Sequence, residues 1–175
     1  MRVLDKSFEL YLEENLIKKR IQELADTINK DYRTDSPLFI GILNGCYAFM
    51  GDLMKNIDIP CELSFLKVSS YEGTESTKEV KELIGLNENV ENRHLVLVED
   101  IVDTGLTMIN ILESLNKKNP KSVEIASLLT KPESLKDRVN VKYKGFEIPD
   151  KFVIGYGLDY NGYGRNLNDI YQIVQ

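Results

Sequence analysis

Two adjacent carboxylates, Glu99 and Asp100, come shortly before a loop at residues 103–107 that is rich in small and hydroxyl-bearing residues. Gly105 would let this loop bend and approach a ligand closely, and its threonine hydroxyls would add donors. A plain phosphate site would avoid carboxylates, because like charges repel. The acidic pair therefore predicts a ligand with a group that prefers negative partners, such as ribose hydroxyls, Mg²⁺ or developing positive charge. Together, the loop and the pair describe a site for a ribose 5-phosphate group.

The residues around the loop predict how it is held. Residues 96–98 form an apolar run of strand formers that stops at the acidic pair, and residues 108–115 carry apolar side chains at helical spacing. A strand, a short loop and a helix bring free backbone N–H groups and the positive end of a helix dipole to one point, which favours phosphate. A simpler interpretation makes Asp103 or Thr104 the N-cap of the helix. That interpretation leaves the acidic pair unexplained.

Other segments predict a sheet that contains this unit. Residues 38–43 form a continuous apolar strand, followed by a tight loop at 44–46 and a helix from 47 to about 55. Further strands are expected at 61–68, 80–84, 122–130 and 168–175, and a helix with a charged outer face is expected from about 13 to 32. This order of elements predicts an α/β fold in which helices flank a mostly parallel central sheet.

Composition limits the class of protein. The 175 residues are 42% hydrophobic and 29% charged, which is typical of a soluble globular chain, and we expect one domain over residues 1–175. No apolar run has the length of a membrane span and no signal-peptide pattern begins the chain, so cytoplasmic residence is expected. The net charge of −6 argues against nucleic-acid binding. Cys46 and Cys61 lack metal-ligand spacing, and His94, the only histidine, is interpreted as structural.

Residues 98–107, VEDIVDTGLT, resemble the phosphoribosyl pyrophosphate (PRPP) signature of the type I phosphoribosyltransferases, and most closely that of the hypoxanthine-guanine branch. The resemblance extends over nearly the whole chain. It implies the fold of that family, with a small hood formed by the chain ends and a flexible lid hairpin at about 69–80. It also implies transfer of the 5-phosphoribosyl group to a 6-oxopurine in purine salvage, with Mg²⁺ as cofactor, pyrophosphate and a nucleoside monophosphate as products, and a homodimer or homotetramer.

The resemblance assigns roles to individual residues. It implies that the 5′-phosphate is held by Asp103, Thr104, Gly105, Leu106 and Thr107, and the ribose by Glu99 and Asp100. It implies that the purine is held by Lys131, Phe152, Val153 and Asp159, and pyrophosphate by Asn44, Gly45 and Arg165. Metal ions would be held by Glu99, Asp100 and Asp159, and Ser70 and Tyr71 would belong to the lid.

Three positions need comment within this resemblance. The family often has a lysine where this chain has Asn44, so a cationic side chain is missing from the pyrophosphate loop. The lid commonly has a glycine in place of Lys78. The family also often has a cis peptide at the pyrophosphate loop, which here would join Leu43 to Asn44.

The implied mechanism has Asp103 as the general base for purine N7, while the acidic pair faces an oxocarbenium-like ribose. A carboxylate of ordinary pKa, near 3.9, is a weak base, so either its surroundings raise that pKa or binding acidifies the purine. The alternatives are a regulatory relative that binds PRPP or nucleotides and controls RNA or DNA, a transferase for pyrimidines or adenine, and an unrelated nucleotide-binding module. Lys131 argues against adenine, which has no 6-oxo group.

Overall fold

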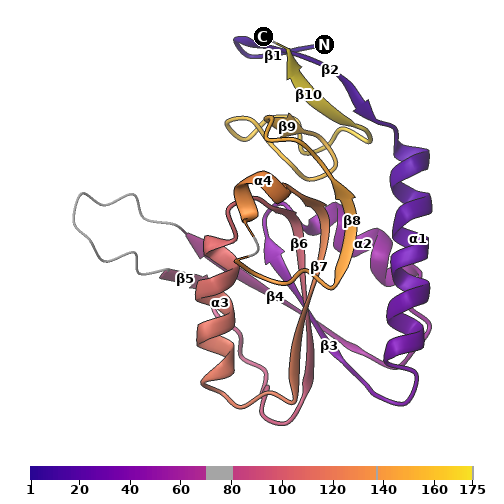
Figure 1. Cartoon of the computed structure of the whole chain (residues 1–175), viewed down its shortest axis with the longest axis vertical. Coiled ribbons are helices and arrows are strands. Elements are labelled where there is room, and N and C mark those ends of the chain that lie inside the picture. The colour runs from indigo at the N-terminus through magenta and orange to yellow at the C-terminus, as the bar shows by residue number, and fades with distance from the viewer. Residues whose placement is uncertain (70–80, 137, 175) are drawn as a thin grey trace.

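The computed structural model describes residues 1–69, 81–136 and 138–174. Its centre is a six-stranded sheet with the order β5-β4-β3-β6-β7-β8 (Figure 1). The strands are β3 (Leu38–Leu43), β4 (Glu62–Ser69), β5 (Lys81–Ile84), β6 (His94–Val102), β7 (Ser122–Thr130) and β8 (Tyr143–Glu147). Only β5 runs antiparallel, against β4, and the other neighbours are parallel. The predicted mostly parallel α/β sheet is confirmed.

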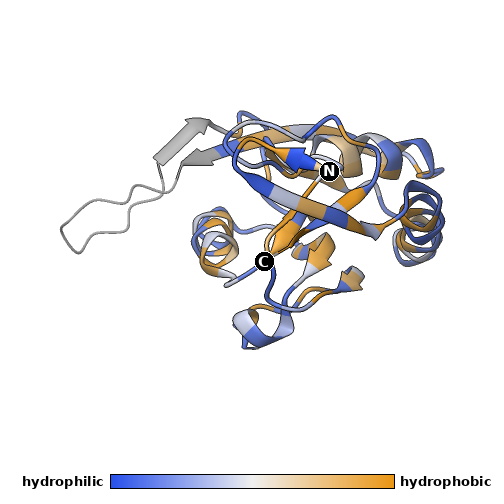
Figure 2. Ribbon diagram, turned by 90° about the horizontal axis from the view of Figure 1, so that it is seen from above, coloured by the Kyte–Doolittle hydropathy of each residue, from blue (hydrophilic) through white to orange (hydrophobic). Residues whose placement is uncertain are grey.

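Helices cover both faces of this sheet. The buried residues of α1 (Glu14–Asp31) and α2 (Tyr47–Lys55) pack in one apolar cluster with alternate residues of β3, β6 and β7. The other alternate residues pack in a second cluster with α3 (Leu106–Asn116). Figure 2 shows apolar residues along the strands and on the helix faces turned toward them. Within the described residues, no helix is both long and apolar enough to span a membrane.

A second sheet lies at one end of the molecule and joins the two ends of the chain (Figure 1). Its order is β1-β2-β10-β9, and all its pairs are antiparallel. The strands are β1 (Arg2–Val3), β2 (Lys6–Leu12), β9 (Val153–Ile154) and β10 (Ile170–Val174). This sheet corresponds to the hood that the family resemblance implies.

Three local expectations need correction. Strand β6 does not stop at the acidic pair but continues to Val102, because β7 pairs with it through residues 99–102. Helix α3 begins at Leu106, directly after Gly105 in a left-handed conformation, and not at Met108. A short helix, α4 (Pro132–Leu135), was not predicted; proline stands at its first position, where a missing N–H costs little. The lid residues Ser70 and Tyr71, with Lys78, lie outside the described residues.

Candidate active site

The acidic pair lies in the part of β6 that no longer pairs with β3. Strand β3 pairs with β6 only as far as Val98, so Glu99 and Asp100 have β7 on one side alone. Successive side chains of a strand point to opposite faces. Glu99 accordingly lines a cavity with residues 101–108, whereas Asp100 faces Gly45, where any Cβ would overlap its carboxylate. A glycine is therefore required at this point of the loop.

The electrostatics of the pair are unfavourable in the protein alone. The Oε2 atom of Glu99 is buried and has no hydrogen-bond partner among the described residues. Burial, together with the neighbouring Asp100 carboxylate, raises the pKa of Glu99 well above its ordinary value. Burial also raises the pKa of Asp100, although hydrogen bonds from the backbone and contact with Glu99 oppose the shift. Two buried carboxyl groups at this point favour a cation between them and the ligand.

The loop after β6 has the shape of an anion site. The cavity of about 110 Å³ is lined by residues 101–108 in addition to Glu99, and it opens at the amino end of α3. Gly105 has a φ of +77°, which favours glycine. Thr104, Leu106 and Thr107 are exposed, so their donors are accessible to a ligand. Thr104 Oγ1 accepts from the N–H of Leu106 at 3.5 Å, which is too long for a strong helix cap.

The predicted base and the predicted purine lysine meet in one cluster. Lys131 follows β7, and its Nζ donates to Asp103 Oδ2 at 2.8 Å and to Asp150 Oδ1 at 3.1 Å. The Lys131 side chain is only 9% exposed. Burial alone would lower the pKa of Lys131, but the hydrogen bonds with both carboxylates outweigh burial and raise it. An ammonium group has three N–H donors, so one of them is left for a ligand.

The segment predicted to bind the purine presents an aromatic surface. The Phe152 side chain, just before β9, is 44% exposed. Its ring lies 5.8 Å from that of Tyr160 in an edge-to-face arrangement and 6.5 Å from that of buried Phe8 in β2. Val153 is buried and pairs with Gln172 of β10. The second sheet therefore supports Phe152 from behind and leaves part of its ring accessible.

The loop at residues 44–46, predicted to bind pyrophosphate, lies between β3 and α2. The Leu43–Asn44 peptide bond is cis, as the resemblance implies. The Asn44 residue is exposed. The carbonyl oxygen of Gly45 lies so close to Gly157 that a Cβ at Gly157 would overlap it. This contact joins the loop at residues 44–46 to the segment that follows β9.

Arg165 and Asp159 form a third polar group nearby. Arg165 Nη2 lies 2.6 Å from Asp159 Oδ1, and Arg165 Nη1 donates to the carbonyl of Gly157 at 2.6 Å. The second carboxylate oxygen of Asp159 accepts from the N–H of Gly162 at 2.6 Å. The two predicted residues are therefore adjacent, but each already has protein partners.

Some of the carboxyl groups of the site suit a bound metal ion better than others. Among the described residues, no three His, Cys, Asp or Glu side chains gather into a ready metal site. Mg²⁺, however, is commonly held by one or two carboxylates together with substrate phosphates and water. The unpartnered Glu99 oxygen and the raised pKa values of the acidic pair fit such an ion. Asp159, which is paired with Arg165, fits less well.

Contacts connect most of the predicted residues, and they add some that the sequence analysis missed. Gly45 touches Asp100, Asp103 contacts Lys131, and Asp159 contacts Arg165. Asp150 was missed because a single aspartate in a loop gives no local signal. The hydrogen bond from Tyr156 to Asp52 was also missed, because it joins residues 104 positions apart.

Known proteins resemble this chain over most of its length. A family model for the phosphoribosyl transferase domain matches residues 8–161. A hypoxanthine-guanine phosphoribosyltransferase from Bacillus subtilis is 41% identical over 160 residues, which are 91% of this chain and 89% of the relative. One from Aquifex aeolicus is 40% identical over 170 residues, 96% of each chain. The crystal structure of a Staphylococcus aureus hypoxanthine phosphoribosyltransferase superposes with a TM-score of 0.90 at 42% identity, over 95% of this chain and 91% of the other.

Proposed function

This chain belongs to the phosphoribosyl transferase domain family, and from that premise we propose that it transfers the 5-phosphoribosyl group of PRPP to hypoxanthine and guanine. The products are the nucleoside monophosphates IMP and GMP and pyrophosphate. The chain is a purine salvage enzyme in this proposal. The observation that supports it most strongly is the cluster in which Lys131 is held between Asp103 and Asp150, beside the cavity lined by residues 103–107.

The phosphate end of PRPP is assigned to the loop after β6. Residues 103–107 surround the cavity at the amino end of α3, where backbone N–H groups and the helix dipole attract an anion. Glu99 and Asp100 would bind the ribose hydroxyls and hold Mg²⁺. When bound, that ion would neutralise the leaving pyrophosphate. The negative field of the pair would also suit positive charge that develops on the ribose.

The purine is assigned to the space between Lys131 and Phe152. Lys131 has one N–H beyond those directed to Asp103 and Asp150, and this donor would reach the 6-oxo group of the base. A 6-amino group offers no good acceptor there, so adenine would be disfavoured. The exposed part of the Phe152 ring would stack on the purine, and Val153 would meet the base edge with its backbone.

Removal of the proton from purine N7 is assigned to Asp103. Its carboxylate has one oxygen on Lys131 and is 44% exposed, so a bound base could reach it. Pyrophosphate is assigned to the backbone of Asn44 and Gly45 and to Arg165, whose guanidinium suits two phosphate oxygens. Asp159 would act near the base. Cytoplasmic residence and a homodimer or homotetramer complete the proposal.

The test offers PRPP and Mg²⁺ with hypoxanthine, guanine, xanthine, adenine or uracil, and measures pyrophosphate release for each base. Turnover with 6-oxopurines only is expected. Turnover with adenine or uracil would contradict the role of Lys131. PRPP binding with no turnover on any base would contradict the enzymatic function and favour the regulatory alternative, which the intact cluster around Lys131 disfavours.

A further inference from the structure

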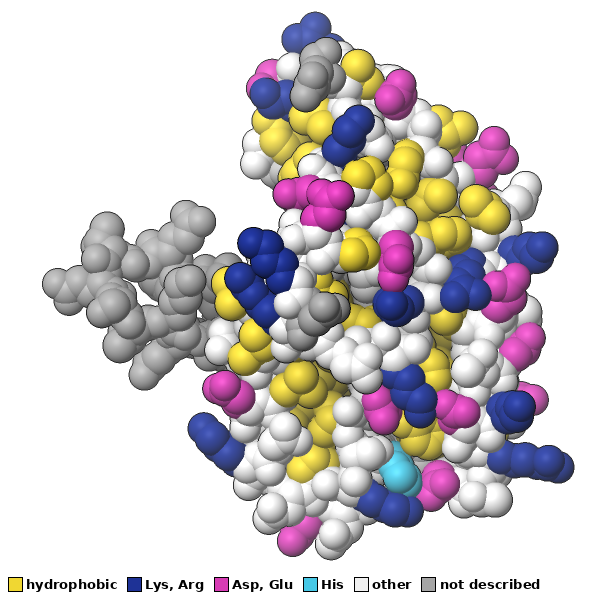
Figure 3. Space-filling model, viewed as in Figure 1, with side chains coloured by type: hydrophobic (Ala, Val, Ile, Leu, Met, Phe, Trp, Pro, Cys, Tyr) yellow, Lys and Arg dark blue, Asp and Glu magenta, His cyan; other side chains and the backbone are white. Residues whose placement is uncertain are grey.

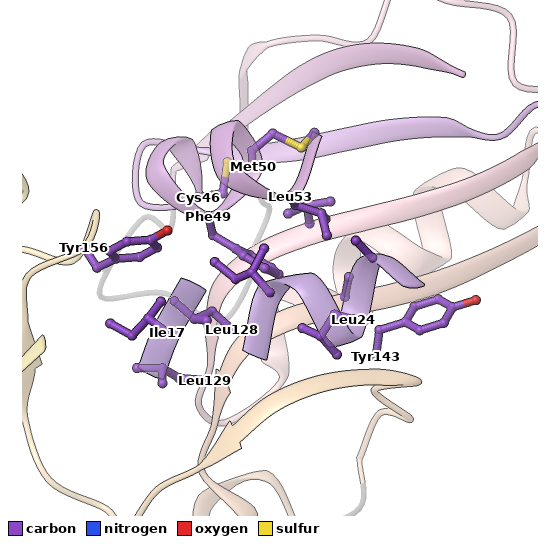
Figure 4. Close-up of a cluster of buried hydrophobic side chains, with 14 of the residues drawn as sticks. Ile17, Leu24, Cys46, Phe49, Met50, Leu53, Leu128, Leu129, Tyr143 and Tyr156 are labelled. Atoms are coloured by element: carbon purple, nitrogen blue, oxygen red, sulfur yellow. The ribbon is translucent and has the colours of Figure 1, made fainter. Parts of the chain in front are cut away.

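One link between α2 and the loop that follows β9 is made by a buried hydroxyl. The Tyr156 side chain is 4% exposed, and its hydroxyl donates to Asp52 Oδ2 at 2.5 Å. Figure 4 shows the Tyr156 ring extending from its loop toward α2, the helix that carries Phe49 and Met50. The other carboxylate oxygen, Asp52 Oδ1, accepts from Lys55 Nζ at 2.8 Å. Both oxygens of Asp52 are thus engaged.

The backbone of this loop is unusual for the residues it contains. Gly155, Tyr156 and Gly157 have φ values of +99°, +51° and +102°. Glycine adopts such angles readily, whereas a tyrosine adopts them rarely. Backbone preference therefore does not explain the tyrosine at position 156. The contact that its hydroxyl makes with α2 does explain it.

The same loop is in close contact with the pyrophosphate loop. There is no space for a Cβ at Gly157 beside the carbonyl of Gly45, nor for a Cβ at Gly45 beside the Asp100 carboxylate. Gly157, Gly45 and Asp100 therefore lie in direct succession. A shift of the purine segment away from α2 would open this contact and move Gly45 relative to the acidic pair.

A second link runs in parallel. Tyr47, the first residue of α2, donates from its hydroxyl to the carbonyl of Arg165 at 2.7 Å. Arg165 in turn donates to the carbonyl of Gly157. The first turn of α2 and its middle are thus both attached to the segment 156–165, and the pyrophosphate loop leads directly into that helix.

We propose that Tyr156 and Asp52 are a positioning pair that fixes the pyrophosphate loop against Asp100 and Gly157. Neither side chain is assigned a contact with the substrates. The pair acts through Gly157, Gly45 and α2, so that binding of the pyrophosphate group depends on a hydrogen bond at the far side of the loop. This inference rests on the proposed function, since it assigns the pair a role in that same site.

The test removes one partner of the hydrogen bond at a time. Tyr156→Phe and Asp52→Ala are each expected to raise KM for PRPP and the dissociation constant of pyrophosphate by about three- to tenfold, as for the loss of one hydrogen bond. KM for hypoxanthine should change less than twofold. The double variant should be no weaker than either single variant, because both remove the same contact.

Tyr143→Phe is the matched control. Tyr143 is 2% exposed, and its hydroxyl donates to Asp31 Oδ2 at 2.9 Å, so it has the same chemistry in the same core cluster. It lies at the opposite end of that cluster from Tyr156 (Figure 4). A purely structural role predicts that both tyrosine variants lose stability with unchanged kinetics. The positioning role predicts weaker PRPP and pyrophosphate binding for Tyr156→Phe alone.

Several results would overturn the inference. Unchanged pyrophosphate affinity in Tyr156→Phe or Asp52→Ala would do so, and so would an equal loss of affinity in Tyr143→Phe. If Tyr156→Phe does not fold, Asp52→Ala supports the same comparison. Titration calorimetry with pyrophosphate and Mg²⁺ needs no turnover. A wild-type chain that binds pyrophosphate but turns over no base would therefore contradict the proposed function without affecting this test.

Discussion

Charged side chains are arranged differently at the two ends of the strands of the central sheet, which we call its amino edge and its carboxyl edge. At the amino ends of the strands, His94 Nδ1 lies 2.6 Å from Ser122 Oγ, Lys121 Nζ lies 3.4 Å from Asp35, and Asp31 binds Lys142. Figure 3 shows the histidine, in cyan, at this end among side chains of both charges. At the carboxyl ends, the buried acidic pair has no lysine or arginine within salt-bridge distance among the described residues, and Lys131 is shared by two carboxylates.

This difference distinguishes side chains that we expect to stabilise the fold from side chains that we expect to bind ligands. At the amino edge, the charged side chains lie beside partners of opposite charge. At the carboxyl edge, a cation bound with substrate would supply the charge that the protein does not provide, so binding is favoured over the empty state. We therefore expect substitutions at the carboxyl edge to change activity more than stability, and substitutions at the amino edge to do the reverse.

The largest effect is expected from Asp103→Asn. Loss of a general base typically lowers kcat by about 10²–10⁴-fold, and the amide keeps the size of the side chain. The free energy of unfolding should change little, because Asp103 is a partly exposed carboxylate. Steady-state kinetics with hypoxanthine and urea unfolding test both parts. A kcat within threefold of wild type would remove Asp103 from the chemistry.

Asp100→Asn should have the next largest effect, on the metal requirement. Removing one carboxylate should raise the Mg²⁺ concentration needed for half-maximal activity by at least about tenfold. Stability without Mg²⁺ should stay the same or rise, because a buried carboxyl group with a raised pKa is removed. The measurements are a Mg²⁺ titration of turnover and thermal unfolding in chelator. A marked fall in stability would show that the pair is structural, like the amino edge.

Asp150→Asn tests how Lys131 is held. Losing one of its two carboxylate partners should raise KM for hypoxanthine by about two- to tenfold, while KM for PRPP stays near wild type. Glu147→Gln is the matched control, since that carboxylate binds Lys144 and not Lys131. Equal effects of the two substitutions on KM for hypoxanthine would argue against a specific role for Asp150.

The smallest effect is expected from Asp31→Asn at the amino edge. The hydrogen bond from Lys142, and a weaker one from Tyr143, lower the pKa of Asp31 although burial opposes the shift. The native pKa lies below the unfolded value, so this contribution to stability is present above about pH 4 and is lost as pH falls through the native pKa. The variant should lose about 0.5 kcal/mol at pH 7 and almost nothing near pH 2, with unchanged kcat/KM. Urea unfolding at several pH values tests this, and a loss of activity would contradict the separation of the two edges.

Much of the fold could be predicted because its signals are local. Apolar runs such as residues 38–43 and the helical spacing after the 103–107 loop depend only on neighbouring residues. The extension of β6 through Glu99 and Asp100 could not be predicted, because it depends on pairing with β7. The sequence predicted a strand at 168–175, but its membership in a second sheet followed only from the family resemblance, since the strands of that sheet come from distant parts of the chain.

The site residues likewise differ in whether a local sequence pattern could predict them. The predicted phosphate loop and the acidic pair lie close together in sequence, so their pattern could be recognised. Asp150 lies 19 positions from Lys131, and Asp52 lies 104 positions from Tyr156. A lone aspartate in a loop or on a helix usually faces solvent, and only the folded chain shows which of them meets a distant partner.

The pairing of β10 with β2 also sets an order of events during synthesis. Ile170–Val174 pairs with residues 7–12, so this sheet closes only after residue 174 has left the ribosome. The central sheet needs nothing beyond β8, and it can assemble around the phosphate loop earlier. Phe152 rests on Phe8 and is held by β10 through the N–H of Ile173. A nascent chain could therefore form the loop at residues 103–107 first, and would gain the support beneath Phe152 only after residue 174 has emerged.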